Sequence, residues 1–420
     1  MTTLSSCLDP VRSRRERLVQ SCRVLRLFLA LRSPLVRSQP VPPARACRGS
    51  SFRFRNRPIS LLPRSLQTRS GKLPDAERYR PEDQRGIEAL YRRVFGADAA
   101  AGSRLRWEWQ YHRNPKNPGG TPLIWVVREG PTIVGHYASM PVRLAVRGRE
   151  LDAAWGTDAM VAPERRRQGL GELLFRTWDR SVGASLGLGL SEASHQLLRK
   201  LHWPEGQMVP CLIKPLSRRA FRRPTWPTAL NRIVSAIFTW PLVKLVGRAR
   251  PLRAEVELVR RFDARSTALW ERVGPNFDLA VRRDAAYLNW KYIDPPHVRY
   301  TVVGLKRDDR FDGYCVFRHV RESLGRATIV VDFLVDPTAE LGFKTLLRWI
   351  DAEARAADSD KIRCYATHAG FRRIMRRSGY FQVKSTLALT AKINAFELPA
   401  DFYDDIDGWH VTFGDSDQDR

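Results

Sequence analysis

The fold of this chain is decided by the stretch Val161-Ala162-Pro163-Glu164-Arg165-Arg166-Arg167-Gln168-Gly169-Leu170-Gly171. It joins an apolar run at residues 158–161 to an amphipathic segment at residues 172–180, which predicts a strand, a turn and a helix. The start of a helix presents unpaired backbone N–H groups and the positive end of the helix dipole. The turn is therefore predicted to bind phosphate groups.

The residue spacing narrows the class of phosphate site. Arg166, Gly169 and Gly171 form the pattern R-x-x-G-x-G, while the chain has no G-x-x-x-x-G-K-[ST] and no G-x-G-x-x-G after a first strand. With Val-x-Pro-Glu upstream, the stretch resembles the pyrophosphate loop of the GCN5-related N-acetyltransferase (GNAT) superfamily, whose members bind acetyl-CoA there. The alternative is an ordinary strand-to-helix turn with surface arginines.

The positive charge of the chain is concentrated at its beginning. The formal net charge is +28, and residues 1–73 carry fifteen arginines and one lysine against Asp9 and Glu16, a net +14. Because this Ser- and Pro-rich segment has no lasting periodicity, residues 1–76 are predicted to be a disordered basic tail. It is either an organelle transit peptide or, as we favour, an over-extended start of the reading frame. With half of the charge in this tail and no DNA or RNA motif, no nucleic acid is expected as a partner.

The six cysteines are scattered and form no C-x-x-C pair. Neither a metal site nor a disulfide framework is predicted, and a reducing cytoplasm is the expected location.

Hydrophobic periodicity predicts a first folded domain at residues 77–216. Two helices at residues 81–95 and 103–113 precede strands at residues 123–127, 133–138 and 142–146 and the strand before the turn. After the turn come a helix to residue 182, a strand at 186–190, a helix at 192–201 and a closing strand at 208–213. This order is the one that the resemblance implies for an acetyltransferase fold. The predicted class is α/β, with a mixed α+β sheet.

Residues 217–256 are predicted to be a linker that contains an amphipathic helix at residues 229–246. Pro241, Arg232 and Lys244 argue against a transmembrane span. The helix either packs across both domains, which we favour, or contacts a membrane surface through residues 229–246.

Three short motifs then recur in the same order, at offsets of 181, 178 and 174 residues. Trp109-Gln110-Tyr111 returns as Trp290-Lys291-Tyr292, residues 133–137 return as 311–315, and residues 158–163 return as 332–337. Ordered repetition at a near-constant offset predicts two tandem acyl-CoA N-acyltransferase-like domains, the second at residues 257–396. An acidic C-terminal tail is predicted at residues 397–420.

The second domain is predicted to be degenerate. At the offset of 174 the positions of Arg166, Gly169 and Gly171 carry Glu340, Phe343 and Thr345. An acid repels phosphate, and bulky side chains block the close approach of the backbone. Only the first domain is therefore expected to bind CoA.

The resemblance implies which residues hold the acyl-CoA. Backbone groups of Met160, Val161 and Ala162 would bind the thioester and the pantetheine, where this strand parts from the strand at residues 186–190. The pyrophosphate would lie on Arg166, Arg167, Gln168, Gly169, Leu170 and Gly171. Ser191 either contacts pantetheine or caps the helix that begins at Glu192.

Two side chains are candidates for proton transfer. His195 would replace the acidic tyrosine that the superfamily often has where this chain has Leu198, because imidazole titrates near neutrality; otherwise it is a surface residue. Asp158 would act as the base, directly or through water. Its recurrence as Asp332 favours a structural role instead.

Together these features predict an N-acetyltransferase that transfers acetyl from its cosubstrate acetyl-CoA to a primary amine of a small molecule or a cell-envelope precursor. One alternative is an aminoacyl or long-chain acyl transferase of envelope or polysaccharide metabolism, which would associate with the membrane. The other is a non-catalytic protein that senses CoA or binds nucleic acid or membrane.

Overall fold

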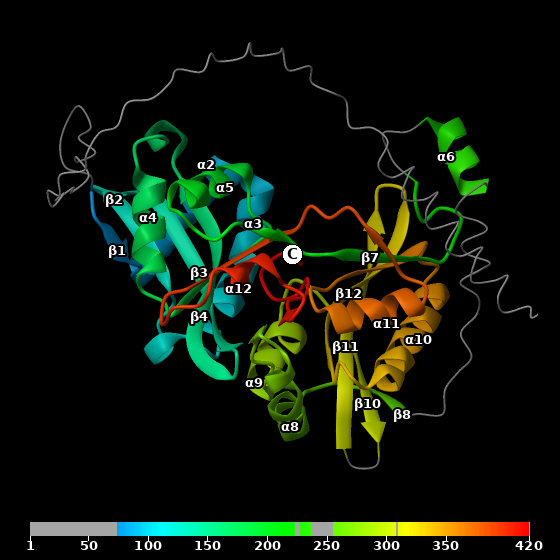
Figure 1. Ribbon diagram of the computed structural model, residues 1–420. Coiled ribbons are helices and arrows are strands. Elements are labelled where there is room, and N and C mark those ends of the chain that lie inside the picture. The colour runs from blue at the N-terminus through cyan, green and yellow to red at the C-terminus, as the bar shows by residue number, and fades with distance from the viewer. Residues whose placement is uncertain (1–73, 223–226, 237–254, 308–309, 420) are drawn as a thin grey trace, which may run out of the picture. The chain divides into compact units, whose positions relative to one another are not determined.

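The computed structural model describes residues 74–222, 227–236, 255–307 and 310–419 (Figure 1). These residues form two halves, each built on a sheet with helices packed against it. This is a mixed α/β fold, as the sequence predicts. The predicted disorder of residues 1–73 and most of the predicted helix at 229–246 lie outside the described residues; α6 (Thr228–Val234) covers the start of that helix.

The first half opens with two helices. The turn η1 (Pro81–Asp83) leads into α2 (Gln84–Phe95), which buries Ile87, Leu90 and Tyr91 at helical spacing. α2 ends at Gly96, as predicted, with a φ of 93° that favours glycine. α3 (Ala97–Trp107) starts earlier than the predicted residue 103, because Gly96 also turns the chain directly into the next helix, and the π-helical turn η2 (Glu108–His112) continues it.

The first sheet has the strand order β1-β2-β3-β4-β5-β15-β6. Its strands from the first half are β1 (Ala76–Arg78), β2 (Ile124–Glu129), β3 (Thr132–Val146), β4 (Arg149–Val161), β5 (Ala184–Leu188) and β6 (Gln207–Met208). The strands predicted at 133–138 and 142–146 are one strand, β3, which pairs with β4 along its length. The helices η4 (Pro163–Arg165), α4 (Leu170–Asp179) and α5 (Glu192–Lys200) follow β4 and β5.

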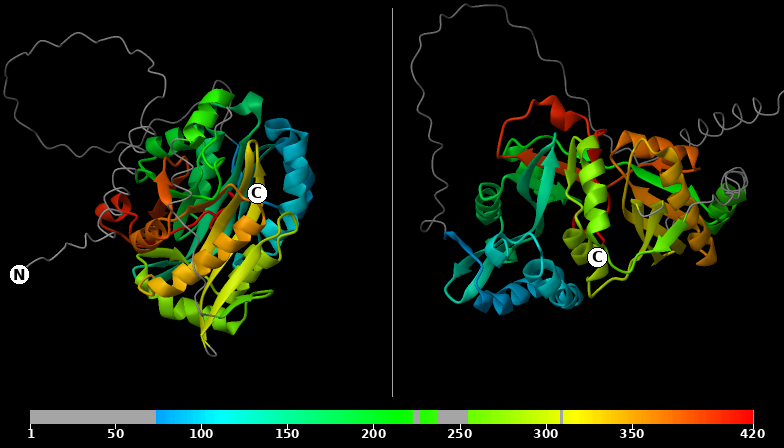
Figure 2. Two further views of the ribbon diagram at one scale, coloured as in Figure 1. Left: turned by 90° about the vertical axis from the view of Figure 1, so that its right-hand side faces the viewer. Right: turned by 90° about the horizontal axis from the view of Figure 1, so that it is seen from below.

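The second sheet has the order β14-β7-β13-β12-β11-β10-β8. Its strands are β7 (Cys211–Pro215), β8 (Glu255–Leu258), β10 (Thr301–Arg307), β11 (Arg310–Glu322), β12 (Gly325–Val335), β13 (Lys361–Tyr365) and β14 (Phe381–Val383). The helices of this half are α8 (Ala264–Val273), α9 (Ala285–Leu288), the π-helical turn η7 (Asn289–Ile293), α10 (Glu340–Ala356) and α11 (Ala369–Arg377). α10 lies across β10, β11 and β12 (Figure 2).

The two halves exchange one strand. β7 pairs with β13 and β14 of the second sheet, although the strand at 208–213 is predicted to close the first domain. β15 (Ala388–Ile393) takes the vacant place beside β5. In Figure 1 the green β7 accordingly lies among the yellow and orange strands of the second half. The predicted position of the closing strand is therefore wrong, because local periodicity identifies a strand but not the strand with which it pairs.

The two copies of the Trp-x-Tyr motif meet where the halves join. Trp109 and Trp290 stack with ring centroids 5.3 Å apart at 22°. Trp109 Nε1 donates to the carbonyl of Trp290 at 2.6 Å, and Trp290 Nε1 donates to the carbonyl of Trp109 at 2.8 Å. Equivalent residues of the two halves thus contact each other reciprocally, as in an isologous interface.

The C-terminal residues are not a peripheral tail. α12 (Asp401–Asp404) and β16 (Trp409–His410) follow β15, and β16 pairs with β9 (Leu279–Val281), which also pairs with β3. Trp409, Val411 and Asp415 are buried. Two acidic residues of this segment, Asp415 and Asp419, therefore lie in the interior, where charges require partners.

Candidate functional site

The predicted phosphate turn lies between β4 and α4. Arg167 and Gly169 have φ angles of 62° and 88°, and α4 begins directly afterwards at Leu170. Among the described residues no side chain caps the N-terminus of α4. The first amides of a ten-residue helix therefore face the space in front of the turn, which suits an anion.

Gly171 leaves space open in the first turn of α4. A Cβ atom built there would lie 3.8 Å from Val161 Cγ2, an ordinary contact. Protein packing alone thus does not require glycine at this position. Its absent side chain keeps the approach to the α4 amides clear for another molecule.

The three arginines of the turn differ in their surroundings. Arg165 forms an ion pair with Glu129, whereas Arg166 and Arg167 are exposed. The Arg166 Nε donates to the Val161 carbonyl at 3.4 Å, and Gln168 Nε2 donates to the Glu164 carbonyl at 3.1 Å. Both exposed arginines belong to the turn that directly precedes the helix start.

An acidic side chain in the first turn of α4 is neutralised from outside the turn. Lys200 Nζ lies 2.5 Å from Glu172 Oε2, and Arg176 Nη2 lies 2.9 Å from Glu172 Oε1. The hydrogen bond from Lys200 is the largest cause that lowers the pKa of Glu172. This carboxylate is therefore already paired and repels an incoming phosphate less.

β4 and β5 part before β4 reaches the turn. Their parallel pairing runs from Ala153↔Ala184 to Trp155↔Leu186 and stops there. Beyond this point β5 continues to pair with β15 on its other edge, up to Leu188. We call the space between residues 157–161 and 187–190 the first strand gap. It lies where the resemblance to the GNAT superfamily implies that the pantetheine of CoA binds.

Only some of the predicted backbone groups face the first strand gap. The N–H of Ala162 donates to the Val134 carbonyl at 2.9 Å, so it points to β3 and is engaged. Met160 pairs with His136 two residues earlier and by alternation also points to β3. Val161 therefore presents its N–H and C=O to the gap, whereas the groups of Met160 and Ala162 point to the other edge of β4.

Asp158 occupies a β-bulge in β4. The pairing register shifts between His136 and Ala138, and Asp158 has a φ of 45°. Tyr91 and Tyr111 donate their hydroxyls to the Asp158 carboxylate at 3.2 and 2.6 Å. The carboxylate is thus held on the side of α2 and η2.

A buried histidine supports the same bulge. His136 Nδ1 lies 2.8 Å from the Asp158 carbonyl oxygen, so Nδ1 must carry the proton that is donated. Burial lowers the pKa of His136, which keeps the ring neutral. Side chain and backbone contacts together fix the strained conformation of residue 158.

The other predicted side chains lie on α5. Ser191 caps the helix, since its Oγ accepts from the Ser194 N–H at 3.2 Å. His195 is half-buried, with its ring beside Gly206, and Leu198 is buried in the core of this half. Of the two alternatives for Ser191, the geometry therefore shows the helix cap.

The second half has a corresponding gap, and it is filled. β12 and β13 pair in parallel only as far as Val330↔Cys364. Beyond that point the C-terminal chain lies between them: Gly414 N–H donates to the Val331 carbonyl at 2.9 Å, and Thr412 bridges to Ala366. A small molecule cannot occupy space that the chain itself fills.

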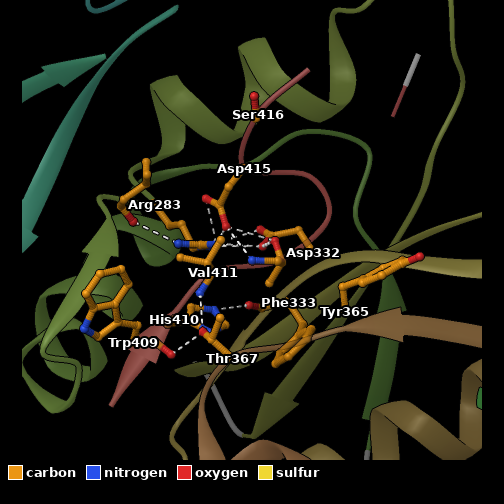
Figure 3. A network of polar contacts seen from close by, with 12 residues as sticks. Arg283, Asp332, Phe333, Tyr365, Thr367, Trp409, His410, Val411, Asp415 and Ser416 are labelled. Atoms are coloured by element: carbon orange, nitrogen blue, oxygen red, sulfur yellow. Dashed lines mark hydrogen bonds and ion pairs between the residues drawn. The ribbon is translucent and has the colours of Figure 1, made fainter. Parts of the chain in front are cut away.

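A buried ionic network fixes this arrangement (Figure 3). The Arg283 guanidinium contacts the carboxylates of Asp332 and Asp415, each at 2.9 Å, and all three side chains are fully buried. Thr412 Oγ1 and Tyr314 hydroxyl also donate to Asp332, both at 2.9 Å. Buried charged groups are stable only when hydrogen bonds satisfy them in this way.

The connection before α10 also lacks the phosphate turn. α10 begins at Glu340, after only residues 336–339, and Phe343 is fully buried between Phe333 and Phe371. The position that corresponds to Gly169 thus belongs to the core. The second half thus has neither the turn before its helix nor an open strand gap; that it does not bind CoA stays a prediction.

Sequence reasoning missed the partners of Asp158. Tyr111 belongs to the recurring Trp-x-Tyr motif, which was a usable signal, whereas no local pattern connects Tyr91 or His136 to residue 158. No group of His, Cys, Asp and Glu residues with metal-site geometry occurs within the described ranges. Within the same ranges, no helix has the length and hydropathy of a membrane span.

Comparisons with known proteins agree with this geometry. The family model of the acetyltransferase (GNAT) domain matches residues 75–185. No curated protein matches the chain by sequence.

Solved structures share the fold over both halves. A probable N-acyltransferase of unknown function from Enterococcus faecalis V583 has a TM-score of 0.53 at 11% identity and covers 77% of this chain and 73% of its own. A GCN5-related N-acetyltransferase from Anabaena variabilis has a TM-score of 0.50 at 13% identity and covers 76% of this chain and 72% of its own. N-myristoyltransferase from Saccharomyces cerevisiae, solved with myristoyl-CoA and inhibitors, has a TM-score of 0.50 at 13% identity, covering 77% and 82%.

Proposed function

We propose that this chain, whose residues 75–185 form a GNAT acetyltransferase domain, is an N-acyltransferase that uses acetyl-CoA and acts on a primary amine. One observation carries the proposal. The uncapped start of α4 and the parting of β4 from β5 occur together in the first half, whereas the corresponding gap of the second half is filled by its own chain. One acyl-CoA site per chain follows.

The residues of the site have separate tasks in this proposal. Acetyl-CoA supplies the thioester, whose carbonyl carbon forms a bond to the amine nitrogen while the bond to sulfur breaks. The α4 amides with Arg166 and Arg167 hold the pyrophosphate, and the Val161 backbone aligns the pantetheine in the first strand gap. The amine nitrogen loses one proton, and the departing thiolate gains one.

Asp158 is better placed as a positioning residue than as the base. Its carboxylate accepts hydrogen bonds from Tyr91 and Tyr111, which hold it on the side of α2 and η2. By holding the bulge, it fixes the direction of the strand that lines the gap. His195 remains the proposed acid, because it is a half-exposed imidazole on the helix that follows β5.

Calorimetric titration of acetyl-CoA into the full chain tests the site. Gly171→Glu places a carboxylate in front of the α4 amides, and Gly171→Gln adds a neutral side chain of the same size. Two unit charges 4 Å apart interact by about 4 kcal/mol at an effective dielectric constant of 20, which is up to ~1,000-fold in Kd. Because a Cβ atom fits at this position, both variants should remain folded.

The two variants separate charge from bulk. We expect Gly171→Glu to bind far more weakly than Gly171→Gln. The proposal is refuted if wild type does not bind acetyl-CoA, or if Gly171→Glu binds it like wild type. Release of free thiol with a panel of primary amines would then identify the class of acceptor.

A further inference from the structure

The C-terminal segment, residues 409–419, connects the two strand gaps. Its first part fills the gap of the second half through His410, Thr412 and Gly414. Its last part reaches the first half, where Gln418 Nε2 donates to the Leu188 carbonyl at 2.9 Å. We propose that Gln418 forms the inner wall of the first strand gap and restricts this enzyme to short acyl groups. This inference rests on the proposed function.

Gln418 is held in place from both sides. Asp415 is tied to the buried Arg283, and Asp419 is bound by Arg318, whose Nε lies 2.9 and 3.0 Å from its two carboxylate oxygens. Both carboxylates are buried. A residue between two such anchors has little freedom to move aside.

The carboxamide of Gln418 lies on the gap side of β5. Gly189 N–H donates to the Ala388 carbonyl of β15, so the backbone groups of Gly189 point away from β4. Because successive residues of a strand point their backbone groups to opposite edges, the Leu188 carbonyl points toward β4. The hydrogen bond from Gln418 to this carbonyl therefore lies in the first strand gap.

Gly189 lets the carboxamide pack directly on the backbone. A Cβ atom at this residue would lie 2.1 Å from Gln418 Oε1 and 2.4 Å from Gln418 Cδ. Gly189 also has a φ of 70°, which favours glycine. The chain is thus shaped at this point to receive the Gln418 side chain.

The position of Leu188 along the first strand gap shows which end of the gap Gln418 closes. β4 and β5 stop pairing at Trp155↔Leu186, so Leu188 lies just beyond the point where the strands part. The phosphate turn is at the opposite, outer end. With ~3.3 Å per residue, residues 157–161 span about 13 Å from the inner end to Val161. An acyl-CoA with its phosphates on α4 therefore directs its acyl group toward Gln418.

The dependence of binding on acyl length tests this inference. The Kd values of acetyl-, butyryl- and octanoyl-CoA would be measured by calorimetry for the full chain and for Gln418→Ala. Each methylene that becomes buried favours binding about fourfold. Gln418→Ala should therefore shift the acetyl to butyryl Kd ratio by about 15-fold in favour of butyryl. Wild type should bind butyryl- and octanoyl-CoA more weakly than acetyl-CoA.

Two matched variants distinguish bulk from other effects. Gln418→Met keeps a side chain of similar length without the hydrogen bond, so it should keep the preference for acetyl. Gln382→Ala removes an exposed glutamine of β14 that bonds to Arg376 and should leave the length profile of wild type.

The outcomes separate this inference from the proposed function. Equal or tighter binding of octanoyl-CoA by wild type overturns the role of Gln418 while leaving the acyl-CoA site intact. An unchanged length profile in Gln418→Ala does the same. Failure of wild type to bind any acyl-CoA refutes the proposed function itself.

Discussion

Replacing Gly169 by alanine tests whether the left-handed turn before α4 contacts the cosubstrate. Gly169 has a φ of 88°, and an L-residue in this conformation costs about 1–2 kcal/mol. If the turn relaxes in the free variant, binding must restore it. The cost then appears in the Kd of acetyl-CoA, as a loss of about 5–30-fold. A Cβ atom beside the pyrophosphate adds to this loss.

Gly148 provides the matched control. It lies in the turn between β3 and β4 with a φ of 77°, and a Cβ atom there would meet nothing within 4 Å. Gly148→Ala should lower the free energy of unfolding by the same ~1–2 kcal/mol and leave acetyl-CoA binding unchanged. Urea denaturation and calorimetry on both variants measure the two effects. If Gly169→Ala binds like wild type, then the turn is not the pyrophosphate site.

Three further predictions concern the interior. Asp415→Ala removes a carboxylate partner of the fully buried Arg283 and should lower the free energy of unfolding by ~3–5 kcal/mol in urea denaturation; a loss below about 1 kcal/mol would contradict the role of this network. Burial holds the pKa values of His136 and His410 below 6.5, so stability should fall as the pH drops from 6.5 toward these lowered values. The unfolded chain then takes up protons that the folded protein does not bind, so the free energy of unfolding should fall by up to ~1.4 kcal/mol per pH unit for each histidine. A urea midpoint that stays constant between pH 7 and 5 would contradict this prediction. Trp109→Phe keeps an aromatic ring but removes the donor to the buried carbonyl of Trp290, so the free energy of unfolding in the same assay should fall by ~1–3 kcal/mol. An unchanged free energy of unfolding would argue against a stabilising role of the reciprocal Trp109–Trp290 hydrogen bonds.

Much of the fold follows from local sequence pattern. The apolar spacing of Ile87, Leu90 and Tyr91 with Gly96 behind it predicts α2, and its bounds agree with the structure. The repeated Trp-x-Tyr and Asp-x-x-Val-x-Pro motifs likewise predict the tandem organisation. These features depend on residues close together in the chain, where periodicity directly reflects burial.

The exchange of β7 and β15 does not follow from such patterns. β7 (Cys211–Pro215) is a short strand that is buried along most of its length, and nothing in its local sequence specifies the strand with which it pairs. The pairing depends on where the whole chain has brought the open edges of β13 and β5. The C-terminal segment is a second case, since its acidic composition suggests an exposed tail.

The sequence by itself determined the strand, turn and helix start at residues 158–180, because a left-handed glycine and an uncapped helix start are local properties of the chain. It also determined that the second half lacks this turn. Only the tertiary structure decided that Val161, rather than Met160 or Ala162, faces the first strand gap, since edge direction depends on pairing with β3. Likewise, only long-range packing brings Gln418 to Leu188, because their contact joins residues that are 230 positions apart in the chain.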